Sequence, residues 1–319
     1  MRRCIRNILV FSLLIVTSLL LISSFSYFVI GSQYKYNYQA SLIDKVARLK
    51  SIEEPKIILV GNSNLSFGIN SEMMEAELGM PVVNLGLHGG LGNVFHEQIA
   101  KLDIDDEDIV VVCHSSYSDD DNIGDKELAL ITYDYNNQLL PIFRKKDYIG
   151  LLKAYPTYLR KSAVLWMLGR GNQDEGGCYS RKAFNKYGDV VVKPEYEQVD
   201  VDLFFEQEGN RAAVPWINDV CMERLNALNQ YCNDHGAKMV VAGYPVAYGK
   251  YDSFGKDDFI KFQRNLEDAL SCDVISDFTD YFYPYDYFYN TALHLNDKGR
   301  EARTKQLIED MKKWMDEQY

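Results

Sequence analysis

The chain has 319 residues, with 46 acidic against 34 basic side chains, a formal net charge of −12 and an isoelectric point near 5.0. This acidic balance argues against nucleic acid, or an anionic membrane surface, as the main partner. Beyond Cys4 there are five cysteines, which are widely spaced and include no CxxC pair, so neither a disulfide framework nor a zinc site is predicted. No phosphate-binding loop is present either, and we expect no cofactor and no metal.

The N-terminus carries an uninterrupted, uncharged apolar run over residues 8–30, and about 20 such residues span a bilayer as a helix. Arg2, Arg3 and Arg6 precede the run, and basic clusters stay on the cytoplasmic side. We therefore predict a cytoplasmic N-terminus (1–7), a single-pass anchor (8–30) and an extracytoplasmic domain. The alternative is a cleaved signal peptide, whose apolar region would be shorter, about 7–15 residues; the long run favours a retained anchor.

The sequence after the anchor predicts an α/β domain. Residues 31–54 are polar and mixed in charge, which suits a stalk or a first helix, and the domain is expected to begin near Pro55. Continuous apolar runs predict buried strands, with helical patterns between them. The strands are expected at 57–60, 82–85 and 109–112, and the helices at 71–78 and 94–102. This alternation predicts βαβ units and a parallel sheet.

The alternation breaks between about residues 118 and 215, where the sequence is acidic, glycine-rich and aromatic, with a helix expected near 149–168. We interpret this stretch as an insertion, either a lid or substrate-recognition subdomain or an elaborate surface excursion. The α/β pattern then resumes. Helices are expected at 218–233, 257–270 and 297–315, and strands at 238–242 and 274–275.

Ser63 is the first candidate for chemistry. It lies in Gly61-Asn62-Ser63-Asn64, directly after the first strand, and ligands of open α/β sheets bind at the carboxyl ends of the strands. A following helix would offer its N-terminal N–H groups to negative charge. The segment is not the GxSxG elbow of α/β-hydrolases. A serine in such a turn is also a common helix N-cap, so the segment alone is a weak signal.

Three further segments carry polar groups that are expected at the same sheet edge. His294 precedes the last helix and suits a general base. Gly86 lies in the glycine-rich end of the second strand, where backbone N–H groups can approach an oxyanion, although a tight turn with an exposed His88 is the simpler interpretation. Residues 113–117 end the third strand without an assigned role.

Taken together, GNSNLSFGI, VVNLGLHGGLG and LHLNDKGR resemble the SGNH (GDSL-like) hydrolase superfamily, in particular the membrane-anchored SGNH-like proteins of bacterial envelope and polysaccharide loci. The resemblance covers about residues 55–112 and 239–315 and leaves out the insertion. It implies a flavodoxin-like three-layer fold, with Ser63 as nucleophile and His294 as base. It also implies that the backbone N–H groups of Ser63 and Gly86 hold the oxyanion.

The sequence departs from this family at three points. Asn62 replaces the acid of the GDS motif, and Thr291 stands where an acid normally precedes the histidine by three residues. We take Asn290 in place of that acid, since an asparagine can hold an imidazole tautomer, although it stabilises imidazolium less well than an aspartate. Asp286 and Asp277 are alternatives from the same loop. The asparagine of the family's third motif is not evident in residues 113–117, so the oxyanion hole lacks its side-chain donor.

These features lead to two hypotheses. The first is an O-acyltransferase or esterase (deacylase) that acts on a cell-envelope glycan through a serine acyl-enzyme; its partners would be a glycan or acyl ester, the membrane through the N-terminal helix and, for transfer, a membrane acyl-transfer partner. The alternative is a catalytically degenerate glycan-binding or assembly protein. The missing acid motivates it, as do the aromatic residues at 281–289, because aromatic faces stack on sugars.

Overall fold

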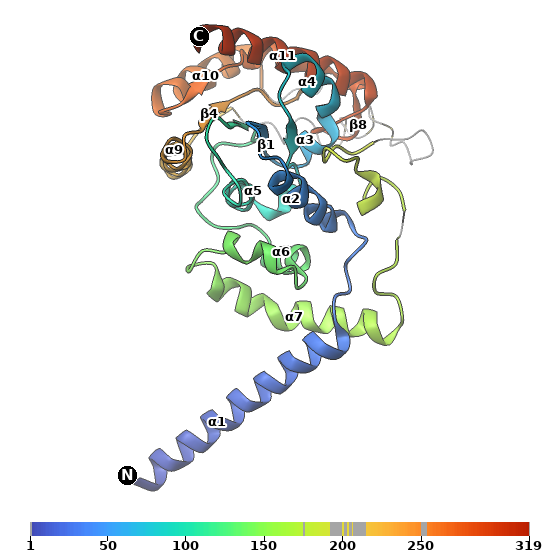
Figure 1. Ribbon diagram of the computed structural model, residues 1–319, viewed down its shortest axis with the longest axis vertical. Coiled ribbons are helices and arrows are strands. Elements are labelled where there is room, and N and C mark those ends of the chain that lie inside the picture. The colour runs from blue at the N-terminus through green and yellow to red at the C-terminus, as the bar shows by residue number, and fades with distance from the viewer. Residues whose placement is uncertain are drawn as a thin grey trace.

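A five-stranded parallel sheet forms the centre of the computed structural model (Figure 1), which describes residues 2–174, 176–191, 200, 203, 206, 215–249 and 254–318. The strands are β1 (Ile57–Val60), β2 (Val82–Asn84), β3 (Ile109–Val112), β4 (Lys238–Val241) and β6 (Asp273–Val274). Their order across the sheet is β2-β1-β3-β4-β6, and every neighbouring pair is parallel. The α/β class and the parallel sheet predicted from the sequence are confirmed.

Helices cover both faces of this sheet. They are α2 (Ser41–Ser51), α3 (Ser63–Gly68), α4 (Ser71–Leu78), α5 (Asn93–Ala100), α9 (Asp219–Asp234), α10 (Lys256–Ala269) and α11 (Asp297–Gln318). Successive side chains of a strand point to opposite faces of the sheet, so each apolar strand contributes residues to two hydrophobic cores, one on each face. Ile58 and Val110 pack with α2, α5 and α9, whereas Leu59 and Val111 pack with α4 and α11. Burial on both sides explains why the strands are continuously apolar.

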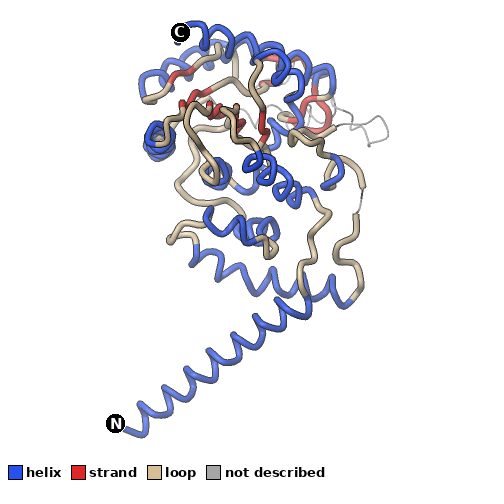
Figure 2. The backbone as a smooth tube through the Cα atoms, viewed as in Figure 1, coloured by secondary structure: helices blue, strands red, loops and turns tan. Residues whose placement is uncertain are grey.

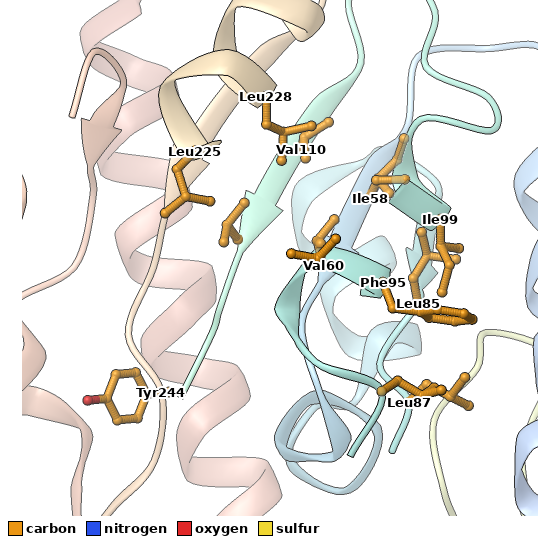
Figure 3. Packing of buried hydrophobic residues seen from close by; sticks show 14 of the residues in the cluster. Ile58, Val60, Leu85, Leu87, Phe95, Ile99, Val110, Leu225, Leu228 and Tyr244 are labelled. Carbon is orange, nitrogen blue, oxygen red and sulfur yellow. The ribbon is translucent and has the colours of Figure 1, made fainter. Parts of the chain in front are cut away.

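The close packing beneath α9 and α5 is visible in Figure 3. Leu225 and Leu228 of α9 lie beside Val110 of β3. Phe95 and Ile99 of α5 pack near the first two strands. These contacts join helices from both halves of the sequence into one core, so the residues before and after the predicted insertion fold together.

The segment between the apolar run and Pro55 is not a stalk. Leu42, Val46 and Leu49 of α2 are fully buried in the core that also contains Ile58. Their spacing of four and three residues places them on one face of the helix. The mixed charge of residues 31–54 made this apolar face difficult to recognise in the sequence. The folded domain therefore begins before Pro55, earlier than predicted.

The predicted insertion contributes two helices that pack against each other, α6 (Lys126–Tyr133) and α7 (Tyr148–Met167), followed by a 3₁₀ turn at Arg181–Ala183. Helix α7 matches the helix expected near 149–168. The part of the domain that adjoins α1 is built from helices and loops, and the strands gather at the far side (Figure 2). Most of the predicted insertion between 192 and 214 lies outside the described residues.

The apolar run forms α1 (Arg2–Phe25), continued by a π-helical turn at Ser26–Ile30. Arg2–Ile30 is the one helix of the described residues that is long and apolar enough to cross a membrane, with a mean hydropathy of 2.6 over its best window, none of which is buried in the domain. The candidate span predicted from the sequence is therefore present as an exposed helix.

Two small sheets follow β4 and were not predicted. β5 (Val246–Tyr248) pairs with β7 (Phe282–Pro284), and β8 (Phe288–Thr291) forms an irregular antiparallel pair with β9 (His294–Leu295). The aromatic segment at 281–289 builds these sheets. Its Tyr281, Tyr283, Phe288 and Tyr289 side chains are buried, so most of its aromatic surface is used in packing and is not offered to a sugar.

Candidate active site

Ser63 is held at the carboxyl end of β1 by a tight connection into α3. Asn62 caps this helix, because its Oδ1 accepts a hydrogen bond of 3.0 Å from the N–H of Asn64. Gly61 is required at the turn, since a Cβ there would lie 2.8 Å from the carbonyl oxygen of Cys113. Ser63 is thereby the first residue of α3, with its hydroxyl at the sheet edge where ligands bind in folds of this class.

His294 reaches Ser63 from the other end of the chain. Its Nε2 lies 2.8 Å from the Oγ of Ser63, although 231 residues separate the two in sequence. β9 carries the histidine, and its position is fixed by Thr291, whose Oγ1 accepts a hydrogen bond of 3.1 Å from the backbone N–H of His294. The distance from Oγ to Nε2 is within the range in which a general base removes a proton.

Asn290 occupies the far side of the imidazole. Its Oδ1 lies 2.7 Å from Nδ1 of His294, and its Nδ2 donates a hydrogen bond of 2.8 Å to the hydroxyl of Tyr179. With the amide in this orientation, Nδ1 carries the proton and donates to Asn290, so the lone pair of Nε2 faces Ser63. The sequence-based choice of Asn290, Ser63 and His294 thus corresponds to three side chains in one hydrogen-bonded chain.

The two aspartates considered as alternatives lie elsewhere. Asp286 forms an exposed ion pair of 2.7 Å with Lys298. Asp277 caps a 3₁₀ turn, where its Oδ1 accepts a hydrogen bond of 2.8 Å from the N–H of Thr279. Among the described residues, no hydrogen bond or ion pair joins a carboxylate to His294.

The imidazole is buried beneath an aromatic side chain. Phe67 of α3 stacks on His294 with 4.1 Å between ring centroids and 10° between ring planes. Burial lowers the pKa of His294 to about 3, and repulsion by His88 acts in the same direction. His294 is consequently neutral at physiological pH, which is the protonation state that a general base requires.

Gly86 does not offer its N–H to the site. That N–H donates a hydrogen bond of 2.9 Å to Oδ1 of Asn84. A Cβ on Gly86 would lie 2.7 Å from the backbone nitrogen of Ser66, so this glycine allows the second strand to pack closely beneath α3. The expected oxyanion role of Gly86 is therefore not supported, because a donor that is already engaged inside the fold is not free to bind substrate.

Three residues of the site were not singled out in the sequence. Tyr179 comes from the predicted insertion and holds Asn290, and Phe67 covers the imidazole. Gly89 is exposed beside Asn62, since a Cβ there would lie 3.7 Å from the Cβ of Asn62. The Gly89-Gly90 pair was a visible signal for this third residue. The other two had none, because only tertiary contacts bring them to the histidine.

Residues 113–117, at the end of the third strand, contact the loop that carries Ser63. Ser115 accepts a hydrogen bond of 2.7 Å from Nδ2 of Asn62. The neighbouring His114 is buried with Glu97, whose carboxylate lies 3.0 Å from His114 Nε2 and also pairs with Arg224 at 2.8 Å. The carbonyl oxygen of Cys113 also accepts a hydrogen bond of 3.0 Å from Nδ2 of Asn64, so residues 113–117 divide between contacts to the serine loop and a buried network with Glu97 and Arg224.

Comparisons with protein-family models, curated proteins and solved structures found no match to this chain. Among the residues that the structure describes, no group of three or more His, Cys, Asp and Glu side chains is arranged to hold a metal ion. What the site can do is therefore argued from its geometry: a serine hydroxyl, a neutral imidazole and an amide in series are the components of nucleophilic acyl transfer.

Proposed function

We propose that this protein is an extracytoplasmic serine esterase (deacylase) or O-acyltransferase of the SGNH type that acts on acyl esters of a cell-envelope glycan. The observation that carries the proposal is the contact of 2.8 Å between Ser63 Oγ and His294 Nε2. The strand order β2-β1-β3-β4-β6, which is the flavodoxin-like order 2-1-3-4-5, supports a flavodoxin-like fold with helices on both sides of the sheet.

In the proposed reaction, Ser63 Oγ attacks the ester carbonyl carbon while its proton passes to His294 Nε2. The tetrahedral intermediate then expels the alcohol, which takes the proton from His294, and the acyl group remains on Ser63. In hydrolysis, water attacks this acyl-enzyme; in transfer, a sugar hydroxyl does so. The attacking group gives its proton to His294, which returns it to Ser63 as the acyl group leaves.

Negative charge on the intermediate needs donors close to Ser63. The backbone N–H of Ser63, at the first position of α3, remains the assigned donor on one side. In place of Gly86, the proposal assigns the second donor to the backbone at Gly89, which borders Asn62 at the exposed rim of the site. Loss of one such donor in other enzymes costs about 2.7–4 kcal/mol of transition-state stabilisation. The rate of acyl transfer at Ser63 therefore depends on whether the backbone at Gly89 supplies the second donor.

The proposed location follows from charge at the N-terminus. Arg2, Arg3 and Arg6 flank the apolar helix and favour a cytoplasmic N-terminus, with the folded domain outside. A domain tethered there meets envelope polymers before it meets soluble metabolites. An acyl donor would have to be exported or passed on by a membrane partner, whereas hydrolysis requires neither.

Labelling with a fluorophosphonate tests the catalytic proposal on the full-length protein in detergent. The probe is expected to modify wild type at Ser63 and to leave Ser63→Ala unmodified. Ser51→Ala is the matched control, because Ser51 is exposed at the end of α2 and bonds only within that helix. For the reaction itself, NMR of the purified glycan from Ser63→Ala cells should show a changed acetyl content; unchanged acetylation would remove the glycan ester as the substrate.

A non-catalytic glycan-binding or assembly protein is the second candidate. It is favoured by one specific observation: the partner of His294 Nδ1 is the neutral amide of Asn290, which stabilises an imidazolium less well than a carboxylate. This candidate predicts that the fluorophosphonate leaves folded wild-type protein unmodified while the protein still binds the glycan. Labelling at Ser63 would exclude it.

A further inference from the structure

Helix α7 has two different faces. Leu151, Tyr158 and Ser162 are buried against the rest of the domain, mainly against α6. The outer face carries large apolar side chains in water, with Leu152 70% exposed and Met167 67% exposed. The exposed apolar set is Ile149, Leu152, Val164, Trp166, Met167 and Leu168. Exposed apolar surface of this extent marks a contact with a partner or a membrane.

The same helix lies against the end of the candidate membrane span. In Figure 1, α7 is the element of the domain that is nearest to α1, and it packs against the π-helical turn that ends the span. The rings of Phe25 and Trp166 meet edge to face with 6.1 Å between centroids. Tyr27 makes a similar contact with Tyr135 after α6, at 5.2 Å. Aromatic side chains of this kind gather where a span leaves the hydrocarbon core.

The connection between the span and the domain is held in place by hydrogen bonds. Asp134, at the end of α6, accepts hydrogen bonds from the N–H of Tyr34 at 3.0 Å and from the hydroxyl of Tyr158 at 2.8 Å. Asn172, just after α7, donates from Nδ2 to the carbonyl oxygen of Ser32 at 2.7 Å. The α6–α7 pair is thus tied to the first residues after the span, which keeps α7 next to the bilayer that α1 would cross.

The segment that contains α7 is basic in sequence, unlike the whole chain, although Arg144 and Lys146 pair with Asp121 and Lys161 pairs with Glu127. Residues 144–170 contain seven basic side chains and a single acidic one, Asp147, whereas the net charge of the protein is −12. Lys153 and Arg160 are exposed and form no ion pair with any described residue. The two residues lie between the apolar groups at the two ends of this face, and long basic side chains in such a position can reach the headgroups of an anionic bilayer while their apolar neighbours enter its interface.

We propose that α7 is a second membrane contact, a helix that lies in the interfacial layer of the same bilayer that α1 spans. Ile149, Leu152 and Met167 enter the acyl-chain boundary, and Lys153 and Arg160 meet the headgroups. The overall acidity, which argues against an anionic surface as the main partner, is compatible with this contact because α7 itself carries three basic side chains and no acidic one. The domain is then oriented on the membrane, not merely tethered to it.

A depth measurement on the full-length protein in phosphatidylcholine–phosphatidylglycerol vesicles tests the proposal. An environment-sensitive fluorophore is attached to Leu152→Cys in a Cys4→Ser background, since Cys4 is an exposed cysteine within α1. Ile260→Cys is the matched control, because Ile260 is also an exposed apolar residue on a surface helix, α10, far from α1 in Figure 1. The readouts are the emission maximum and quenching by lipids that carry a nitroxide just below the headgroup.

The label at Leu152 is expected to emit at shorter wavelength and to be quenched by the nitroxide lipid, while the label at Ile260 does neither. A water-like emission at both positions would overturn the proposal. A short-wavelength emission at Leu152 that the nitroxide lipid does not quench, and that disappears when the protein is diluted into excess lipid, would also overturn it. In that case a second copy of the chain covers the face. Neither readout depends on whether Ser63 is catalytic.

Discussion

Phe67 and His294 stack face to face with 4.1 Å between their ring centroids, and this contact links the nucleophile helix to the base. Phe67 lies four residues after Ser63 on α3, so the helix that presents the hydroxyl also covers the imidazole. The stack fixes the plane of the ring and keeps water from one of its faces. Desolvation of this kind is the main reason why the pKa of His294 falls to about 3.

Replacement of Asn290 by aspartate should change the pH dependence of the site. Neutral His294 is the active base and exists above its pKa, so labelling of wild type should persist into acid and be lost only as the pH falls toward about 3. A carboxylate next to Nδ1 favours imidazolium and raises this pKa. In Asn290→Asp the acid limb of the fluorophosphonate labelling rate should therefore move to higher pH, and the rate at pH 7 should rise. Asp286→Asn is the control, and an unmoved acid limb in Asn290→Asp would contradict the assigned role.

Tyr179→Phe should slow the same labelling reaction without preventing it. The substitution removes the hydroxyl that accepts from Nδ2 of Asn290, which leaves the amide free to rotate away from the histidine. One hydrogen bond of this kind contributes about 0.5–1.5 kcal/mol, so the labelling rate should fall up to about tenfold. Tyr248→Phe, at an exposed tyrosine of β5, should leave the rate unchanged. Equal rates in all three proteins would show that Tyr179 does not position Asn290.

Acid should destabilise the fold partly through His96. This side chain is fully buried, and neither ring nitrogen has a partner among the described residues. Burial, aided by repulsion from His114, lowers its pKa to about 3. Since the unfolded chain binds the proton near pH 6.5, stability should be greatest above that pH. It should decline on acidification toward pH 3 by up to about 1.4 kcal/mol per pH unit from this group.

His96→Phe removes that titration while keeping the volume of the ring. Thermal unfolding of the solubilised protein at pH 8 and pH 5 should show a smaller acid-induced loss in His96→Phe than in wild type. His235→Phe serves as the control because His235 is exposed at the end of α9. If wild type and His96→Phe lose equal stability between the two pH values, protonation of the His96 ring is not the cause of the acid-induced loss of stability.

Leu49→Ala tests the place of α2 in the core. Leu49 is fully buried, so the truncation leaves a cavity and should cost about 2–5 kcal/mol of unfolding free energy. Lys50→Ala, one residue further along the same helix and exposed, should change stability by less than about 0.5 kcal/mol. Chemical denaturation of both variants measures the difference. A stalk would give the same small effect for each.

Arg303→Met tests how α11 supports the serine loop. The buried guanidinium donates hydrogen bonds to the carbonyl oxygens of Asn64, at 2.7 Å, and Gly243, at 3.2 Å. Removing it takes one hydrogen bond from each buried oxygen, which should cost about 1–3 kcal/mol and reduce labelling of the adjacent Ser63. Lys305→Met, on the exposed side of α11, should do neither. Normal labelling in Arg303→Met would mean that the loop holds its shape unaided.

Elements with a strong local pattern were predictable. The strand Ile57–Val60 and the helix Ser71–Leu78 have the predicted bounds, because burial on both faces makes the strand continuously apolar and because Asn70 and Gly79 flank the helix as caps. The short strands β8 and β9 were not predicted. They are irregular and only a few residues long, so their pairing depends on the packing around them and not on their own periodicity.

The sequence by itself determined the apolar helix at the N-terminus, the parallel sheet and the residue types at the strand ends, since each depends on a local pattern of hydrophobicity. Only the tertiary structure decided that Asn290, and neither Asp286 nor Asp277, contacts His294, and that Gly86 is engaged with Asn84. It likewise decided that Trp166 of α7 meets Phe25 at the end of α1. Contacts between residues far apart in the chain are set by how the elements pack, and no local pattern encodes them.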